Sequence, residues 1–115
     1  MDIDSCIPRV LLVDDDPHLT RSIRLAMRRE PWSMDVTDSA PEALDLLDKH
    51  SYDVIVSDDH MPRMRGCELL RIARTRHPET MRVLLTGQAT VESTIAAIND
   101  AGVFHVLTKP CPSDR

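Results

Sequence analysis

The segment YDVIVSDDHMP, residues 52–62, indicates which class of fold this chain adopts. Its consecutive β-branched residues, Val54 to Val56, are typical of a strand that is buried on both faces of a parallel sheet. Two carboxylates, Asp58 and Asp59, follow almost at once, and Pro62 prevents the strand from continuing. Because open α/β sheets bind ligands at the carboxyl ends of their strands, Asp58 is the first candidate for a reactive group.

The rest of the chain alternates between short apolar strands and amphipathic helices. Further strands are predicted near residues 10–13, 34–36, 83–85 and 104–107. Helices are predicted at Pro17 to Arg29, after Pro41, after Gly66, and from Val91 to a C-cap at Gly102. This β-α alternation with short loops predicts one α/β domain whose strands run parallel.

Two of the helix starts carry recognisable capping residues. Asp16 precedes Pro17 and is predicted to be the N-cap of the first helix. The run Ser39-Ala40-Pro41-Glu42 has the spacing of a capping box, in which the Ser39 and Glu42 side chains bond each other's backbone N–H groups.

Composition excludes several classes of protein. The 115 residues suffice for one domain, and a net charge of -5 with three aromatic residues argues against a nucleic-acid surface. No apolar run could span a bilayer and no signal peptide is evident, so we expect a cytoplasmic location without membrane binding. Cys6, Cys67 and Cys111 fit neither a disulfide framework nor a zinc site.

Four predicted strands end in residues whose side chains can react or bind a ligand. The parallel topology brings these strand ends to one edge of the sheet. The residues are Asp14 and Asp15, Asp58, Thr86 and Lys109. Each motif alone is more often a cap or a turn, but their joint occurrence at successive strand ends favours a site. A cluster of carboxylates suits Mg²⁺, and a carboxylate can act as a nucleophile toward phosphorus. An ammonium and a hydroxyl would then stabilise the phosphoryl oxygens.

At this point the sequence resembles the receiver domain of two-component response regulators. The resemblance is carried by LLVDDDP at 11–17, VIVSDDHMPRMRG at 54–66, LLTG at 84–87 and LTKP at 107–110. It implies a flavodoxin-like (CheY-like) doubly wound fold, with a five-stranded parallel sheet of strand order 2-1-3-4-5.

The resemblance also implies a role for each matching residue. Asp58 would accept a phosphoryl group, as a 4-aspartylphosphate, from the phosphohistidine of a sensor histidine kinase or phosphotransfer protein. Asp15 and Asp58 would bind Mg²⁺ through their side chains, with Mn²⁺ as an alternative ion, and His60 through its backbone carbonyl. Asp14 would act mainly through a metal-bound water.

Thr86 and Lys109 would contact the phosphoryl oxygens, again by resemblance. The domain would promote its own phosphorylation and slow hydrolysis, and it would act as a switch rather than as a conventional enzyme. Its phosphorylation state would pass to an output domain or partner, and a homodimer is compatible with this role.

Several positions depart from the usual pattern of these domains. Val106 stands where Tyr or Phe is common, which puts an aromatic switch at that position in doubt. His60 and Gln88 occupy positions that tune phosphoryl lifetime in the family. The loop reads PRMRG where an acidic or neutral residue is commoner before the glycine, and we expect Arg63 and Arg65 to be solvated.

The carboxyl end also departs from the pattern. Residues 111–115 could supply at most the first turn of a fifth helix. We therefore expect residues 1–115 to be a single receiver domain that lacks most of this helix and any following output domain. The stretches LLTGQATVESTIAAIND and VFHVLTKPC resemble receivers joined to cyclic-dinucleotide phosphodiesterases.

Two other functions compete with the phosphorylated receiver. A pseudo-receiver would keep the fold as a protein-interaction module without phosphorylation, and the complete set of acids, threonine and lysine argues against it. A haloacid-dehalogenase-like phosphohydrolase would also use an Asp at a strand end, but its second acid would stand where His60 stands here. The sequence identifies neither the cognate kinase, the output, the oligomeric state nor the phosphoryl lifetime.

Overall fold

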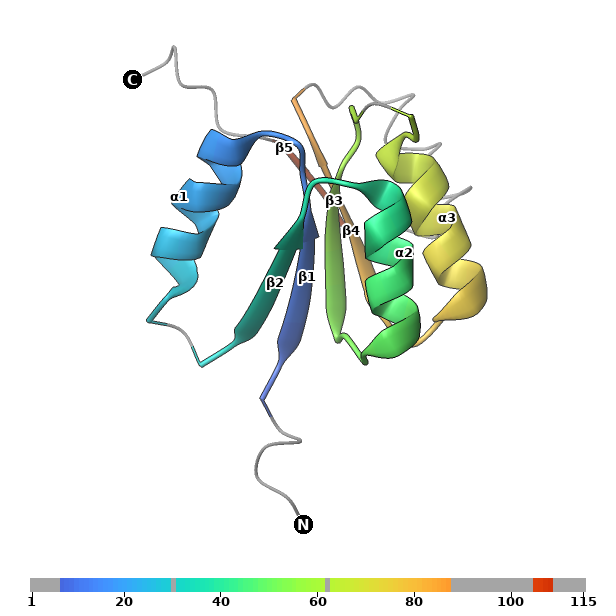
Figure 1. The fold of residues 1–115 in the computed structure, drawn as a ribbon, viewed down its shortest axis with the longest axis horizontal. Coiled ribbons are helices and arrows are strands. Elements are labelled where there is room, and N and C mark those ends of the chain that lie inside the picture. The colour runs from blue at the N-terminus through green and yellow to red at the C-terminus, as the bar shows by residue number, and fades with distance from the viewer. Residues whose placement is uncertain (1–6, 30, 62, 88–104, 109–115) are drawn as a thin grey trace.

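A parallel β-sheet forms the centre of the computed structural model, which describes residues 7–29, 31–61, 63–87 and 105–108 (Figure 1). Within these residues the sheet has five strands: β1 (Arg9–Val13), β2 (Ser33–Thr37), β3 (Val54–Asp58), β4 (Met81–Thr86) and β5 (His105–Thr108). Their order is β2-β1-β3-β4-β5, and every neighbouring pair is parallel. The predicted flavodoxin-like order 2-1-3-4-5 is therefore confirmed.

Helices cover both faces of this sheet. Helix α1 (Pro17–Met27) lies on one face, and α2 (Ala40–Lys49) and α3 (Gly66–Arg76) lie on the other (Figure 1). The predicted fourth helix and the segment 109–115 fall outside the described residues, so the structure does not test the expectation about a fifth helix. Among the residues described, no helix is long and apolar enough to cross a membrane.

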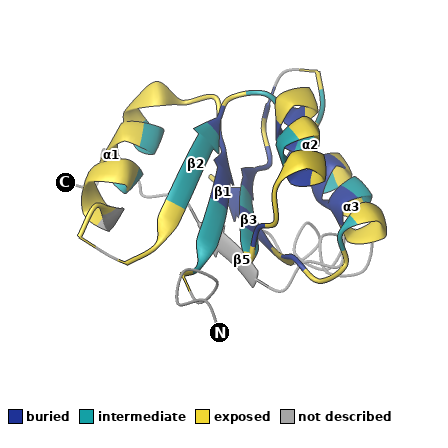
Figure 2. Cartoon of the chain, turned by 60° about the horizontal axis from the view of Figure 1, so that its bottom comes forward, coloured by how far each residue is buried: buried dark blue, intermediate teal, exposed yellow. Residues whose placement is uncertain are grey.

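The hydrophobic core lies between the sheet and the pair α2 and α3. In Figure 2 the inward surfaces of these two helices are buried, whereas α1 is largely exposed. Side chains of alternate strand positions meet the apolar faces of the helices, as their periodicities require. The core includes Leu11, Val13, Ile55 and Leu84 from the strands, and Ala43, Leu47, Leu69, Leu70 and Ala73 from the helices.

The opposite face of the sheet is less well covered. Ile55 is fully buried against α2 and α3, but Val54 and Val56, which point the other way, are only half-buried. The prediction that this strand is buried on both faces is therefore wrong for one face in the described structure. The reason is that α1 alone covers this face among the described elements, and its Leu19 and Ile23 are themselves half-buried.

The helix starts follow the predicted capping residues, with one correction. The Asp16 carboxylate accepts hydrogen bonds from the backbone N–H groups that begin α1, at 3.0 and 3.4 Å. The Ser39 hydroxyl accepts from the Glu42 N–H at 3.3 Å. The reciprocal bond of the predicted capping box does not form, because the Glu42 carboxylate accepts from the Thr37 hydroxyl and the Ser39 N–H donates to that same hydroxyl.

Candidate functional site

The carboxyl ends of β1 and β3 place two acidic segments side by side. In the parallel register Val13 is paired with Ser57, so Asp14 and Asp58 are the next residues along two adjacent strands. Asp58 is the last residue of β3 and is 2% exposed, and Asp14 is 1% exposed. Two carboxylates are therefore buried at the same edge of the sheet.

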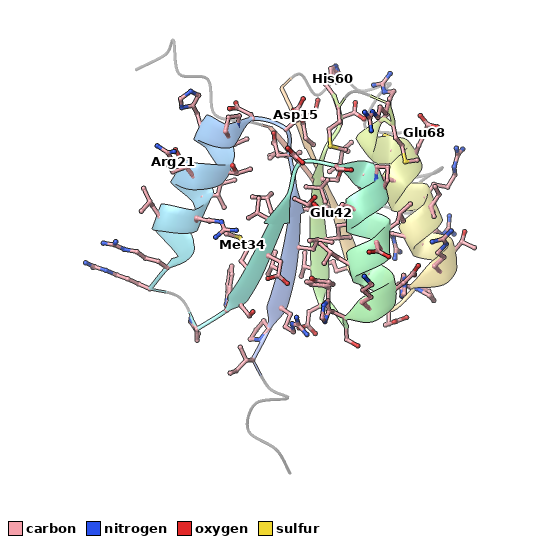
Figure 3. All side chains as sticks on the ribbon, in the orientation of Figure 1. Asp15, Arg21, Met34, Glu42, His60 and Glu68 are labelled. Atoms are coloured by element: carbon pink, nitrogen blue, oxygen red, sulfur yellow. The ribbon has the colours of Figure 1, made fainter. Side chains whose placement is uncertain are left out.

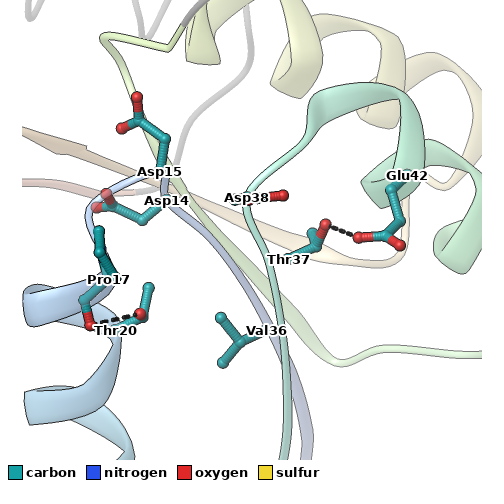
Figure 4. Close-up of a pocket in the computed structure, with 8 residues that line it drawn as sticks. All are labelled: Asp14, Asp15, Pro17, Thr20, Val36, Thr37, Asp38 and Glu42. Atoms are coloured by element: carbon teal, nitrogen blue, oxygen red, sulfur yellow. Dashed lines mark hydrogen bonds between the residues drawn. The ribbon is translucent and has the colours of Figure 1, made fainter.

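A third carboxylate, that of Asp15, completes an acidic cluster. Each of Asp14, Asp15 and Asp58 offers a carboxylate oxygen, and these three oxygens lie within 4.8 Å of one another. Asp15 is exposed and lies at the mouth of the cluster, where Figures 3 and 4 show it at the carboxyl edge of the sheet. The predicted convergence of these acids is observed, whereas their roles remain predictions.

Backbone hydrogen bonds hold the cluster in place. The Asp14 N–H donates to the Thr37 carbonyl at 3.0 Å, which extends the pairing of β1 and β2 by one residue. The Asp14 carboxylate accepts from the Asp16 N–H at 2.8 Å, and the Asp58 carboxylate accepts from the His60 N–H at 3.4 Å. Because a carboxylate has several acceptor sites, these bonds orient the two side chains without excluding a cation.

The donor set fits a hard divalent cation. Like charges this close repel one another, and a cation that accepts oxygen ligands relieves that repulsion. The cluster contains only carboxylate oxygens, which favours Mg²⁺ or Mn²⁺ over a softer metal. His60 stands on the same edge of the sheet with an exposed side chain, so its imidazole points away from the core (Figure 3).

A hollow of about 370 Å³ adjoins the cluster on the side of β2 (Figure 4). Its described lining contains no basic side chain and consists of Asp14, Asp15, Pro17, Thr20, Val36, Thr37, Asp38 and Glu42. The sequence reasoning missed Asp38, although the rule that found the other acids also applies to it. Asp38 directly follows β2, and its strand end lies at the same edge of the sheet.

Thr86 lies at the end of β4, next to the acidic cluster along the sheet edge. Asp58 is paired with Leu85 in the register, so Thr86 extends one residue beyond it, and it is 4% exposed. Lys109 follows the last residue of β5, Thr108, which is paired with Thr86. Lys109 itself lies outside the described residues, so its predicted place at the site is untested.

Arg65 is exposed as expected, and the structure adds an ion-pair partner for its side chain. The Arg65 guanidinium donates a hydrogen bond of 2.8 Å to the carboxylate of Asp59, the buried residue that follows the candidate acceptor. Burial acts to raise the pKa of Asp59, but the bonds from Arg65 and the Cys67 thiol outweigh it and lower that pKa overall. Arg63 is exposed as expected and has a left-handed backbone, with φ of 75°.

Comparison with known proteins identifies relatives across nearly the whole chain. The family model described as the response regulator receiver domain matches residues 10–115. The cell cycle response regulator CtrA of Brucella ovis is 34% identical over 107 residues, which are 93% of this chain and 46% of that protein. The chain thus spans less than half the length of the curated relatives that it matches.

Solved structures show the same fold. The signal receiver domain of an HD domain-containing protein from Pseudomonas fluorescens Pf-5 superposes with a TM-score of 0.86 at 30% identity, covering 94% of this chain and 79% of that one. The response regulator TrrA from Thermotoga maritima, solved in complex with Mg(2+)-BeF, gives a TM-score of 0.80 at 23% identity, covering 94% and 91%. The second likeness shows the fold alone.

Proposed function

The chain belongs to the response regulator receiver domain family, and we propose that it is a phosphoacceptor switch of a two-component system. In this proposal Asp58 receives a phosphoryl group from the phosphohistidine of a sensor histidine kinase or phosphotransfer protein. The observation that carries the proposal is the convergence of three carboxylate oxygens within 4.8 Å at the carboxyl edge of the sheet.

The proposed transfer uses Asp58 as the nucleophile. A carboxylate oxygen of Asp58 forms a bond to phosphorus while the bond from phosphorus to the donor's imidazole nitrogen breaks. The electron pair of the broken bond stays on that nitrogen, and Asp58 becomes an acyl phosphate. The fold supports this chemistry because Asp58 lies at the end of a rigid central strand, where its position is well defined.

We propose Mg²⁺ as the cofactor, with Mn²⁺ as an alternative. Asp15 and Asp58 would hold it through their carboxylates, His60 through its backbone carbonyl, and Asp14 through a bound water. When bound, the ion supplies positive charge that offsets the mutual repulsion of the carboxylates and of the incoming phosphoryl oxygens. The response regulator TrrA, a protein of the same fold, was solved in complex with Mg(2+)-BeF.

Two other residues are proposed to stabilise the phosphorylated state. The Thr86 hydroxyl, buried at the end of β4, would donate to a phosphoryl oxygen, and Lys109 would supply a point charge. Because Thr86 belongs to β4, a change in its hydrogen bonding can be transmitted to the elements that pack on that strand. The domain is thus proposed to act as a switch and not as a turnover enzyme.

The proposed partners are a kinase on one side and an output module on the other. The curated relatives are more than twice as long as the matched segment, and one solved relative comes from an HD domain-containing protein. We therefore propose that this receiver controls an output domain joined to it, with a cyclic-dinucleotide phosphodiesterase as one candidate.

Intact mass spectrometry tests the proposed function. The folded chain is incubated with acetyl phosphate and saturating Mg²⁺. Asp58→Asn is the test variant, and Asp59→Asn, at the adjacent acid, is its matched control. We expect one phosphoryl adduct on the wild type and on Asp59→Asn, none on Asp58→Asn, and none without Mg²⁺. A folded wild type that forms no adduct would instead support the pseudo-receiver.

A further inference from the structure

The loop that joins β3 to α3 carries an ion pair between its two ends. Asp59 directly follows the proposed acceptor, and Arg65 directly precedes the first residue of α3. The Asp59 carboxylate is 7% exposed and the Arg65 side chain is 62% exposed. A buried carboxylate is thus neutralised by a guanidinium that reaches it from the solvent side, through a bond of 2.8 Å.

Backbone hydrogen bonds attach Asp59 to two neighbouring elements as well. Its N–H donates to the Leu85 carbonyl of β4 at 2.9 Å, and its carbonyl accepts from the Gly66 N–H of α3 at 3.0 Å. The next residue, His60, has an imidazole that is 75% exposed. The position of the His60 backbone therefore depends on how firmly Asp59 is held.

We propose that the Asp59–Arg65 ion pair positions the backbone of His60 for the divalent cation. The inference rests on the proposed function, in which the His60 carbonyl is a ligand. Removing the guanidinium would leave the Asp59 carboxylate with the Cys67 thiol and the exposed His60 imidazole, whose Nδ1 lies 3.7 Å away, and neither replaces the 2.8 Å guanidinium bond. A buried charge that loses its ion partner is costly unless water reaches it. The loop would open to admit that water, and the His60 carbonyl would move with it.

The direction in which Mg²⁺ affinity changes when Arg65 is replaced separates this positioning role from a simple charge effect. Arg65 is a cation near a cation site, so by Coulomb's law alone its removal should strengthen Mg²⁺ binding. Loss of a positioned ligand should weaken it. The variant Arg65→Gln, which retains a polar side chain without the charge, therefore gives opposite results under the two explanations.

The experiment is a Mg²⁺ titration of the folded chain by isothermal titration calorimetry. We expect Arg65→Gln to bind Mg²⁺ about tenfold more weakly, the usual scale when support behind a metal ligand is lost. Arg76→Gln is the matched control, because it makes the same charge change at the far end of α3 and breaks a 3.3 Å pair with Asp48, whose carboxylate is solvent-exposed. It should change the affinity by less than about twofold.

A double variant tests the mechanism of the effect. In Asp59→Asn/Arg65→Gln the buried charge is removed together with its partner, so the loop no longer needs to hydrate it. We expect Mg²⁺ affinity to return to within about twofold of the wild type. At saturating Mg²⁺, the maximal rate of phosphorylation by acetyl phosphate should be similar in all variants, because the ligand position and not the nucleophile is affected.

Each outcome is decisive. Arg65→Gln that binds Mg²⁺ as tightly as the wild type, or more tightly, overturns the positioning role and leaves the proposed function intact. A folded wild type that binds no Mg²⁺ overturns both. If Arg65→Gln does not fold by urea titration, Arg65→Lys replaces it, with the same expected direction and a smaller loss, since an ammonium lacks the planar fork.

Discussion

Gly66 shows how one residue without a side chain sets the geometry of the site. A Cβ atom at this position would lie 2.1 Å from the carbonyl oxygen of Asp58 and 2.9 Å from the Cα of Asp59. Backbone atoms cannot yield as a flexible side chain can, so the start of α3 approaches the acceptor residue this closely only because residue 66 is glycine.

Gly66→Ala should therefore destabilise the chain and impair phosphorylation. We expect a loss of about 1–3 kcal/mol in the free energy of unfolding, typical of overpacking, and slower adduct formation because the backbone of Asp58 must shift. Gly87→Ala is the matched control, since nothing lies within 4 Å of a Cβ there. Urea unfolding of both variants checks the prediction, and equal effects would contradict it.

Tyr52 offers a second measurement at the residue scale, at the opposite edge of the sheet. It is the chain's single tyrosine, and it is 5% exposed. Burial, together with the 2.6 Å hydrogen bond to the Asp35 carboxylate, raises the pKa of Tyr52 from 10.0 to about 12. The ultraviolet absorbance of tyrosinate should therefore appear well above pH 10 in the folded chain and near pH 10 in urea.

The raised pKa of Tyr52 also makes the free energy of unfolding depend on pH. A group whose pKa is higher in the folded state stabilises that state fully below the unfolded pKa, and the contribution is lost as pH rises through the folded value. The free energy of unfolding should thus fall between pH 10 and about 12. Asp35→Asn should lower the Tyr52 pKa, and an unchanged titration in that variant would refute the assigned cause.

At the scale of single elements, helix α2 begins with a partly formed capping box. The Ser39 hydroxyl bonds the Glu42 N–H, while the Glu42 carboxylate turns to Thr37 on the preceding strand. Ser39→Ala should cost about 1 kcal/mol in unfolding free energy. Ser51→Ala, an exposed serine beyond the other end of α2, should cost almost nothing. Denaturation of the pair provides the test, and indistinguishable midpoints would argue against the cap.

The same helix illustrates which features of an element follow from its sequence. Local chemistry predicts the Ser39 cap, because a serine before Ala-Pro-Glu has a bonding partner within its own first turn. The partner of Glu42 could not be predicted, since Thr37 competes for it only once β2 and α2 are placed together. The Asp59–Arg65 pair has the same origin: the partners are six positions apart, and only the folded structure brings them into contact.

At the scale of the whole molecule, strand order and the acidic cluster could be predicted because both follow from parallel topology. Residues at the ends of adjacent parallel strands must meet, so Asp14 and Asp58 converge once the alternation of elements is recognised. How closely each face of the sheet is covered does not follow from the strand pattern alone. Half-buried Val54 and Val56 carry the same pattern as a fully buried strand, and only the packing distinguishes them.

The less covered face contains an apolar cavity of about 210 Å³, bordered by residues of β1, β2, β3, β4 and α1 together with the chain's single tryptophan. The lining consists of Val10, Leu12, Ile23, Trp32, Met34, Val56 and Leu85. Trp32 is 44% exposed, and burying such a surface contributes favourably to folding. We propose that a further helical segment of the natural protein packs on this face.

Carrying the chain through about 20 further residues of its natural protein, enough for one helix, should raise the thermal midpoint. It should also shift the emission of Trp32 to shorter wavelength as the half-exposed indole becomes buried. An extension of the same length made of Gly and Ser is the control, because it adds chain without an apolar face. If both extensions gave the same midpoint and emission, the proposed cover would be refuted.

The central claim is that Asp58 carries the phosphoryl group, and chemical mapping tests it most directly. The chain is phosphorylated with acetyl phosphate and Mg²⁺, reduced with borohydride, which converts an acyl phosphate of aspartate into homoserine, and then sequenced by tandem mass spectrometry. The account predicts conversion at Asp58 and at no other acid of the chain. Conversion at Asp15 or Asp59 instead, or an adduct that borohydride does not reduce, would contradict it.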